Sequence, residues 1–228
     1  MKLRILIVKF KNELKSEEVV WFRGAVIHSL AQDNVLFHNH QEERLRYSYP
    51  LIQYKRIKGC AAIVCIGEGV EAIGNFFANY QRTLHIGQRE LTMEIDYVRP
   101  TLYNVQLWDS VFTYHLNRWL PLNAENYKQY QQLEDPDEQK SFLERMLVGN
   151  ILSFAKGVGL HVETPLSCKI VDISDSYLIK NKDIKMVAFN VVFSTNISLP
   201  AYIGLGKNAS INCGIVTKYY PKSEDAEN

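Results

Sequence analysis

The order of predicted strands and helices in the N-terminal half constrains the possible folds of this chain more than any other feature of its sequence. Residues of alternating character predict strands, and apolar residues three and four apart predict helices. The predicted elements are a strand over Leu3–Phe10, a helix from Ser16 to about Asn34, strands over Tyr47–Ile57 and Ala61–Ile66, a helix opening at Gly67–Gly69, and strands within Leu84–Val98. This strand–helix–strand–strand–helix–strand order is that of the ferredoxin-like unit.

The C-terminal half repeats the start of this order and then departs from it. Val105–Leu120 is typical of a strand, and Asp135 and Pro136 suit the N-cap and first position of a helix that ends near Gly157. A short turn and a glycine-rich loop near Leu199 stand where a second helix would fall. The further strands are expected near Lys169–Ile173, Lys185–Thr195 and Gly214–Tyr220.

These elements predict an α+β protein of two tandem ferredoxin-like (βαββαβ) domains, the second degenerate with a C-terminal glycine-rich loop. The N-terminal domain would cover residues 1–104, the C-terminal domain residues 105–222, and a flexible tail residues 223–228. Domains of either length can bury an adequate core. The repeat is inferred from element order, because the two halves share no visible sequence identity.

The composition is that of an ordinary globular protein, with 46% apolar and 22% charged residues. No apolar run reaches the ~18 residues that span a bilayer. The first residues lack the small-residue cleavage site of a signal peptide, so we expect a cytoplasmic protein. The cysteines form no C-x-x-C pair and are interpreted as small core residues. They are Cys60, Cys65, Cys168 and Cys213.

Two basic stretches stand out on a chain whose net charge is only +1. One runs from Arg44 to Lys58 and the other from Leu205 to Lys222, and neither contains an acidic residue. Basic residues gathered in this way indicate a site for a polyanion such as nucleic acid. Each stretch taken alone would also fit a solvated surface strand.

The glycine-rich loop Gly204–Gly214 formally matches a dinucleotide-binding pattern, but the required helix and acidic residue do not follow it. The Walker phosphate-binding pattern fails as well, because Ala201 and Asn208 stand at positions that it reserves for other residues. What remains is a loop with backbone N–H groups, Lys207 and Ser210, which could approach a phosphate backbone closely. An ordinary flexible hairpin loop is the alternative.

The segment His38-Asn39-His40 has three interpretations. The histidines could be surface residues. They could bind a metal, but the further ligands would have to come from elsewhere in the chain. They could also cleave RNA without a metal, one removing the proton of a ribose 2′-OH and the other protonating the leaving 5′-oxygen.

Charged and aromatic residues near this segment could complete such a site. A cation would offset the charge that grows on the phosphorane, and tyrosines could stack on unpaired bases or donate a phenolic proton. The candidate cations are Arg23, Arg46 and Lys55, and the candidate tyrosines are Tyr47, Tyr49 and Tyr54.

An ordered set of motifs resembles the CRISPR-associated endoribonucleases that cut repeat RNA into guide RNAs, members of the repeat-associated RNA-binding superfamily. Each motif alone is weakly specific, but together they cover nearly the whole chain in the family's order. The motifs are Phe22-Arg23-Gly24-Ala25, Phe37-His38-Asn39-His40, Tyr49-Pro50-Leu51-Ile52-Gln53-Tyr54-Lys55, Ile66-Gly67-Glu68-Gly69 and Ile203-Gly204-Leu205-Gly206-Lys207.

The resemblance implies tandem ferredoxin-like domains and metal-independent cleavage that leaves a 2′,3′-cyclic phosphate and a 5′-OH, with no cofactor. It places the usual catalytic histidine at His38 or His40 and the family's glycine-rich loop at Gly204–Gly214. One departure concerns the loop's end, where Asn212-Cys213-Gly214 replaces the family's glycine–aromatic–glycine.

We therefore expect an endoribonuclease that acts by general acid–base catalysis on CRISPR precursor RNA. The expected partner is CRISPR repeat RNA and not a membrane, while a second copy of the chain and effector-complex subunits are left open. A non-catalytic RNA-binding subunit of the same fold is the alternative, and a ferredoxin-like small-molecule or oligomerisation module with no RNA role is a third hypothesis. The expected catalytic residues are His38, His40, Tyr47 and Lys55, and the expected RNA-binding residues are Arg23, Arg46, Tyr49, Gln53, Tyr54, Gly204, Gly206, Lys207 and Ser210, with no metal ligand.

Overall fold

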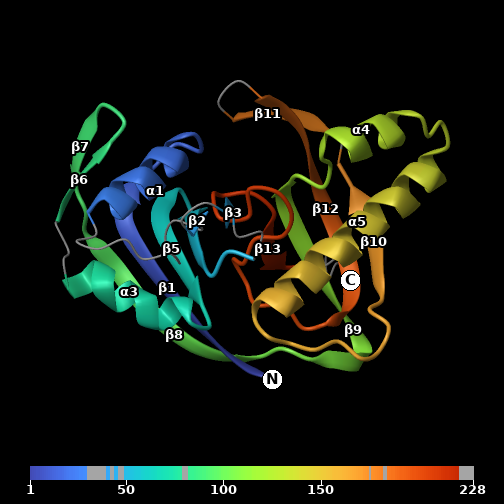
Figure 1. The fold of residues 1–228 in the computed structure, drawn as a ribbon, viewed down its shortest axis with the longest axis horizontal. Coiled ribbons are helices and arrows are strands. Elements are labelled where there is room, and N and C mark those ends of the chain that lie inside the picture. The colour runs from blue at the N-terminus through green and yellow to red at the C-terminus, as the bar shows by residue number, and fades with distance from the viewer. Residues whose placement is uncertain are drawn as a thin grey trace, which may run out of the picture.

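The computed structural model shows two β-sheets side by side, each with helices packed against it (Figure 1). It describes residues 1–29, 40–41, 44–45, 49–78, 82–174, 176–181 and 184–220, and within these it leaves out the side chains of residues 40, 41, 44, 45, 75 and 181. No helix in these ranges is long and apolar enough to cross a membrane.

The N-terminal sheet is antiparallel, with strand order β4-β5-β1-β8. This is the order in which a βαββαβ chain places its second, third, first and fourth strands, so the predicted ferredoxin-like arrangement is confirmed. The elements are β1 (Lys2–Glu13), α1 (Glu18–His28), β4 (Ile52–Ile57), β5 (Cys60–Ile66), α3 (Gly69–Ala78) and β8 (Ile95–Asn104). Two small ribbons accompany them, β2 (His40–Gln41) with β3 (Arg44–Leu45) and β6 (Thr83–Ile86) with β7 (Arg89–Thr92).

The C-terminal sheet repeats that topology in the order β10-β12-β9-β13, and β11 pairs with β12. The chain from β12 to β13 contains no helix, as the sequence predicts; α4 and β11 are additions to the predicted elements. The elements are β9 (Leu107–Trp119), α4 (Ala124–Gln131), α5 (Pro136–Gly157), β10 (Cys168–Ile173), β11 (Tyr177–Asn181), β12 (Ile184–Ile197) and β13 (Ile215–Lys218).

The long helix α5 begins as the sequence predicts. The side chain of Asp135 accepts a hydrogen bond from the backbone N–H of Asp137 at 3.0 Å, and Pro136 takes the first helical position. This satisfies one of the N–H groups that every helix start leaves without a partner. The helix ends at Gly157, where the chain turns toward β10.

The core continues from one sheet to the other. Buried residues of β1 and β5, including Ile5 and Val64, belong to the same apolar cluster as Leu147 and Phe154 of α5 and Phe193 of β12. The opposite face of the N-terminal sheet packs under α1 and α3 in a second cluster. Of the cysteines, Cys65, Cys168 and Cys213 are buried as expected, and Cys60 is half-buried. Because apolar burial links the two sheets, they are held in a fixed relation.

Two glycines of α5 provide a matched test of this packing. A Cβ at Gly157 would overlap the Cβ of Tyr49 and lie 3.1 Å from its Cγ, whereas one at the exposed Gly149 meets nothing within 4 Å. We expect Gly149→Ala to raise the free energy of unfolding by up to ~1 kcal/mol, because alanine favours helix. Gly157→Ala should lower it by ~1–3 kcal/mol through overpacking.

Urea denaturation of both variants measures the two effects against the wild-type chain. Equal shifts of the same sign would show that Gly157 does not pack on Tyr49 in solution.

Candidate functional site

The glycine-rich loop of the C-terminal half lies along the outer edge of β4, between the two sheets (Figure 1). The N–H of Tyr54 donates to the carbonyl of Ser210 at 2.7 Å, and the N–H of Asn212 donates to the carbonyl of Tyr54 at 3.0 Å. The N–H of Arg56 donates to Oδ1 of Asn212 at 2.9 Å. The loop thus satisfies the edge of β4 in the way that a further strand would.

Asn212 lies where this loop departs from the pattern of the family that the sequence resembles. Its φ of +59° lies in the left-handed region, which asparagine tolerates better than most residues. The side chain is buried and turns toward β4 rather than to solvent. The side chain of Asn212 therefore anchors the loop to β4 and does not project from the loop's outer face.

A closed ring of buried hydrogen bonds ties the loop to the start of β4. Nε2 of Gln53 donates to the hydroxyl of Tyr49 at 2.9 Å, and that hydroxyl donates to the carbonyl of Gly204 at 2.9 Å. The N–H of Gly204 donates back to Oε1 of Gln53 at 2.8 Å. Burial raises the pKa of Tyr49, so the hydroxyl stays a donor. Each polar atom of the ring has a partner, as buried polar groups require.

Lys55 extends this contact. Its side chain is fully buried, and Nζ donates to the carbonyl of Ala209 at 2.6 Å. Burial lowers the pKa of Lys55 to about 7, while the nearby Cys213 opposes that shift. A Cβ at Gly204 would overlap the backbone carbonyl oxygen of Ala209, which accepts this hydrogen bond, so glycine is needed where the loop passes over the lysine.

Several residues expected to touch RNA or to act in catalysis are buried in this structure. Lys55, Tyr54 and Gln53 are 0% exposed and Tyr49 is 7% exposed, so their side chains do not face solvent. Tyr54 instead packs edge-on against Phe22 of α1, with ring centroids 5.9 Å apart. These side chains are buried because helices cover one face of β4 and the distant glycine-rich loop covers its edge.

The other expected residues divide into three groups. Lys207 is exposed on the loop, Gly206 and Ser210 are half-buried there, and Gly204 is buried. Arg23 is half-buried on α1. His38, Arg46 and Tyr47 lie outside the described residues, and the side chain of His40 does as well, although its backbone pairs with Leu45.

A cleft of about 300 Å³ opens between the start of α1, β11 and the glycine-rich loop. Two basic side chains that no sequence motif indicates, Arg118 and Lys180, line it. Arg118 is the next-to-last residue of β9 and has a left-handed φ of +55°; its N–H donates a 2.8 Å hydrogen bond to Oδ1 of Asn190. Lys180 comes from β11, and Asn208 from the loop. These residues are far apart in the sequence, so no local pattern could have found them.

This cleft can hold an anion. Arg118 and Lys180 supply positive charge, and among the described residues that line the cleft the one carboxylate is that of Glu17. The guanidinium of Arg118 also opposes the rise that burial causes in the pKa of the Cys213 thiol. Arginine suits phosphate recognition, because its planar group donates several hydrogen bonds. In the described ranges, no group of three or more His, Cys, Asp or Glu side chains could hold a metal ion.

The buried amine of Lys55 predicts a pH dependence of stability. In the unfolded chain it titrates near 10.5, and in the folded chain near 7. Between these values the unfolded state binds more protons, so the contribution of Lys55 to the free energy of unfolding rises with pH and is lost as pH falls toward 7. In Lys55→Met this slope should be absent.

Urea unfolding of wild type and Lys55→Met from about pH 6 to about pH 10 gives the difference directly. The exposed Lys207→Met serves as the control, with a difference from wild type that does not change with pH. A constant difference for Lys55→Met as well would show that the buried amine titrates normally.

Two models of protein domains match most of the chain. The Cas6b N-terminal domain model matches residues 1–101, and the Cas6b C-terminal domain model matches residues 106–219. An uncharacterized protein of Methanocaldococcus jannaschii is 36% identical over 103 residues, which is 45% of this chain and 69% of that protein.

Solved structures agree. The crystal structure of a Cas6b superposes with a TM-score of 0.84 at 27% identity, covering 96% of this chain and all (100%) of the other. A second, titled as the CRISPR RNA processing endoribonuclease Cas6b, has a TM-score of 0.75 at 26% identity over the same shares. Csf5, a type IV Cas6 crRNA endonuclease, shares the fold at 12% identity and a TM-score of 0.58. With both domain models matched in order along its length, the chain belongs to the Cas6b family.

Proposed function

We propose that this protein is an endoribonuclease that cleaves CRISPR precursor RNA within its repeats. The observation that carries the proposal is the match over 96% of the chain to a Cas6b whose title names it a CRISPR RNA processing endoribonuclease. The cationic cleft beside the glycine-rich loop supports it, because a polyanionic substrate needs such a surface.

The proposed reaction uses the RNA's own 2′-hydroxyl as nucleophile. A general base removes its proton, and the oxygen attacks the adjacent phosphorus. The bond to the 5′-oxygen breaks, and a general acid protonates that leaving oxygen. The products are a 2′,3′-cyclic phosphate and a 5′-OH, and the step requires neither a metal nor an external oxidant or reductant.

His38 and His40 are the proposed base and acid, because imidazole titrates near neutral pH. Tyr47 and Arg46 remain proposed members of the site. Lys55 takes a different role from the one expected, because its amine holds the loop at Ala209 and does not face solvent. Lys207, Gly206 and Arg23 remain proposed RNA contacts, to which we add Arg118 and Lys180 of the cleft.

Cleavage of a repeat RNA from the source genome in the presence of EDTA tests the chemistry. We expect full activity, with products whose 3′ ends are cyclic phosphates and resist 3′ labelling until the cyclic phosphate is opened and removed. Activity that disappears in EDTA and returns with a divalent cation would contradict the metal-free mechanism. Binding of the RNA without any product would favour a non-catalytic RNA-binding subunit.

The double variant His38→Ala/His40→Ala tests the acid–base assignment. General acid–base catalysis contributes ~10²-fold or more to such rates, so single-turnover cleavage should slow by at least that factor while RNA affinity stays near the wild-type value. His161→Ala, which changes an exposed histidine beyond the end of α5, is the control and should cut normally. Undiminished cleavage by the double variant would place the chemistry on other residues.

A further inference from the structure

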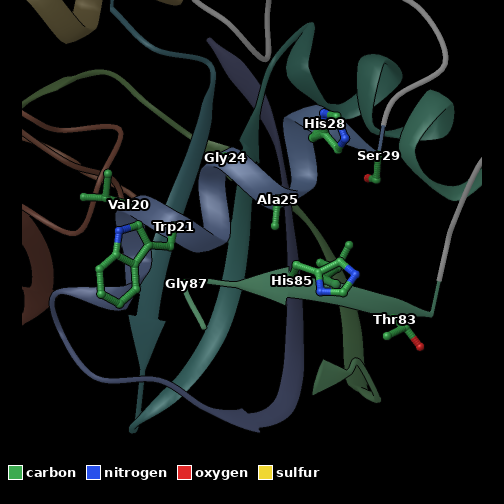
Figure 2. A pocket seen from close by; sticks show the side chains of 10 residues that line it. Val20, Trp21, Gly24, Ala25, His28, Ser29, Thr83, His85 and Gly87 are labelled. Carbon is green, nitrogen blue, oxygen red and sulfur yellow. The ribbon is translucent and has the colours of Figure 1, made fainter. Parts of the chain in front are cut away.

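A second cavity, of about 370 Å³, opens between α1 and the β6–β7 ribbon (Figure 2). Trp21, Gly24 and His28 line it from the helix, and Thr83, His85 and Gly87 line it from the ribbon. Among the residues that the structure describes, neither the glycine-rich loop nor Lys55 lines this cavity.

Trp21 is the largest side chain of the cavity and is 51% exposed. One edge of the indole packs against Gly87 of the ribbon. A Cβ at Gly87 would lie 2.6 Å from Cε3 and 2.9 Å from Cζ3 of the indole. Gly87 has a φ of +63°, so glycine suits the turn as well as the contact. The backing fixes the indole in place while about half of its surface stays open.

The cavity adjoins the cationic cleft. Val20 and Trp21 line both, so the two hollows follow one another along α1, from the glycine-rich loop to the helix end at His28. Arg118 and Lys180 line the cleft, at the loop end. The other end carries the exposed imidazoles of His28 and His85 (Figure 2).

The far end can also form directional hydrogen bonds. The hydroxyl of Ser29 donates to the carbonyl of Val26 at 2.7 Å, which leaves its oxygen able to accept from a ligand. The hydroxyl of Thr83 and the two imidazoles can each donate or accept. An aromatic face, hydrogen-bonding edges and adjoining cations together match one class of ligand, a nucleotide of a single strand.

We infer that this cavity binds one unpaired nucleobase of the RNA, stacked on the indole of Trp21, with the flanking phosphates toward Arg118 and Lys180. The inference rests on the proposed function, since it names the part of the substrate that lies along α1. Stacking of this kind is tolerant of sequence, because every base has a π-face that the indole can cover.

Equilibrium binding of the repeat RNA, with 2′-deoxyribose at the mapped cleavage position so that it stays intact, tests the inference. Trp21→Ala should weaken affinity by about tenfold or more, the effect of removing one stacking platform. The slope of log affinity against log salt should stay at the wild-type value, because stacking releases no counterions. Trp21→Phe keeps an aromatic face and should retain most of the affinity, which separates stacking from a folding defect.

Tryptophan fluorescence adds a direct readout. RNA should quench the emission of the wild-type protein and of Trp108→Phe, in which an exposed tryptophan outside both cavities is changed. The quenching should be lost in Trp21→Phe.

Unchanged affinity in Trp21→Ala, or quenching that persists in Trp21→Phe, would overturn the inference even if the wild-type protein binds and cuts the repeat. A wild-type protein that neither binds nor cuts would overturn the proposed function and this inference with it.

Discussion

The pairing of the glycine-rich loop with the edge of β4 is the contact on which the candidate site depends. An open strand edge leaves backbone N–H and C=O groups without partners, and here a segment about 150 residues further along the chain supplies them. Buried hydrogen bonds reinforce this pairing. One comes from Lys55, and the others form the closed ring of hydrogen bonds among Tyr49, Gln53 and Gly204. It brings the C-terminal loop to the strand that follows the histidine segment.

A shared apolar core keeps this pairing in register. α5 packs between the loop and both sheets: its Gly157 lies against Tyr49, and its Asn150 accepts a hydrogen bond from Nε1 of Trp119 at 2.8 Å, beside Gly206. The loop is therefore fixed from β4 on one side and from α5 and β9 on the other. The cationic cleft takes its shape from that arrangement, since it is lined by the same loop and by β9 and β11 of the C-terminal sheet.

Strong local patterns made the elements predictable. Alternating aliphatics in β1 and the Asp135-Pro136 start of α5 depend only on neighbouring residues, and both are confirmed. The residues of the site were harder to predict, because the exposure of a side chain depends on what packs against its strand. Tyrosines and basic residues in Tyr49–Lys58 suggested a binding surface, yet four of the side chains chosen there are buried. The cations Arg118 and Lys180 carry no local signal at all.

The sequence by itself determined the order of the elements, the replacement of a helix by the glycine-rich loop, and a resemblance that the domain matches then confirmed. Only the tertiary structure decided which residues of these motifs face solvent. The physical reason is that periodicity and capping act over a few residues, whereas burial of Lys55 and exposure of Trp21 are set by segments that meet from distant parts of the chain.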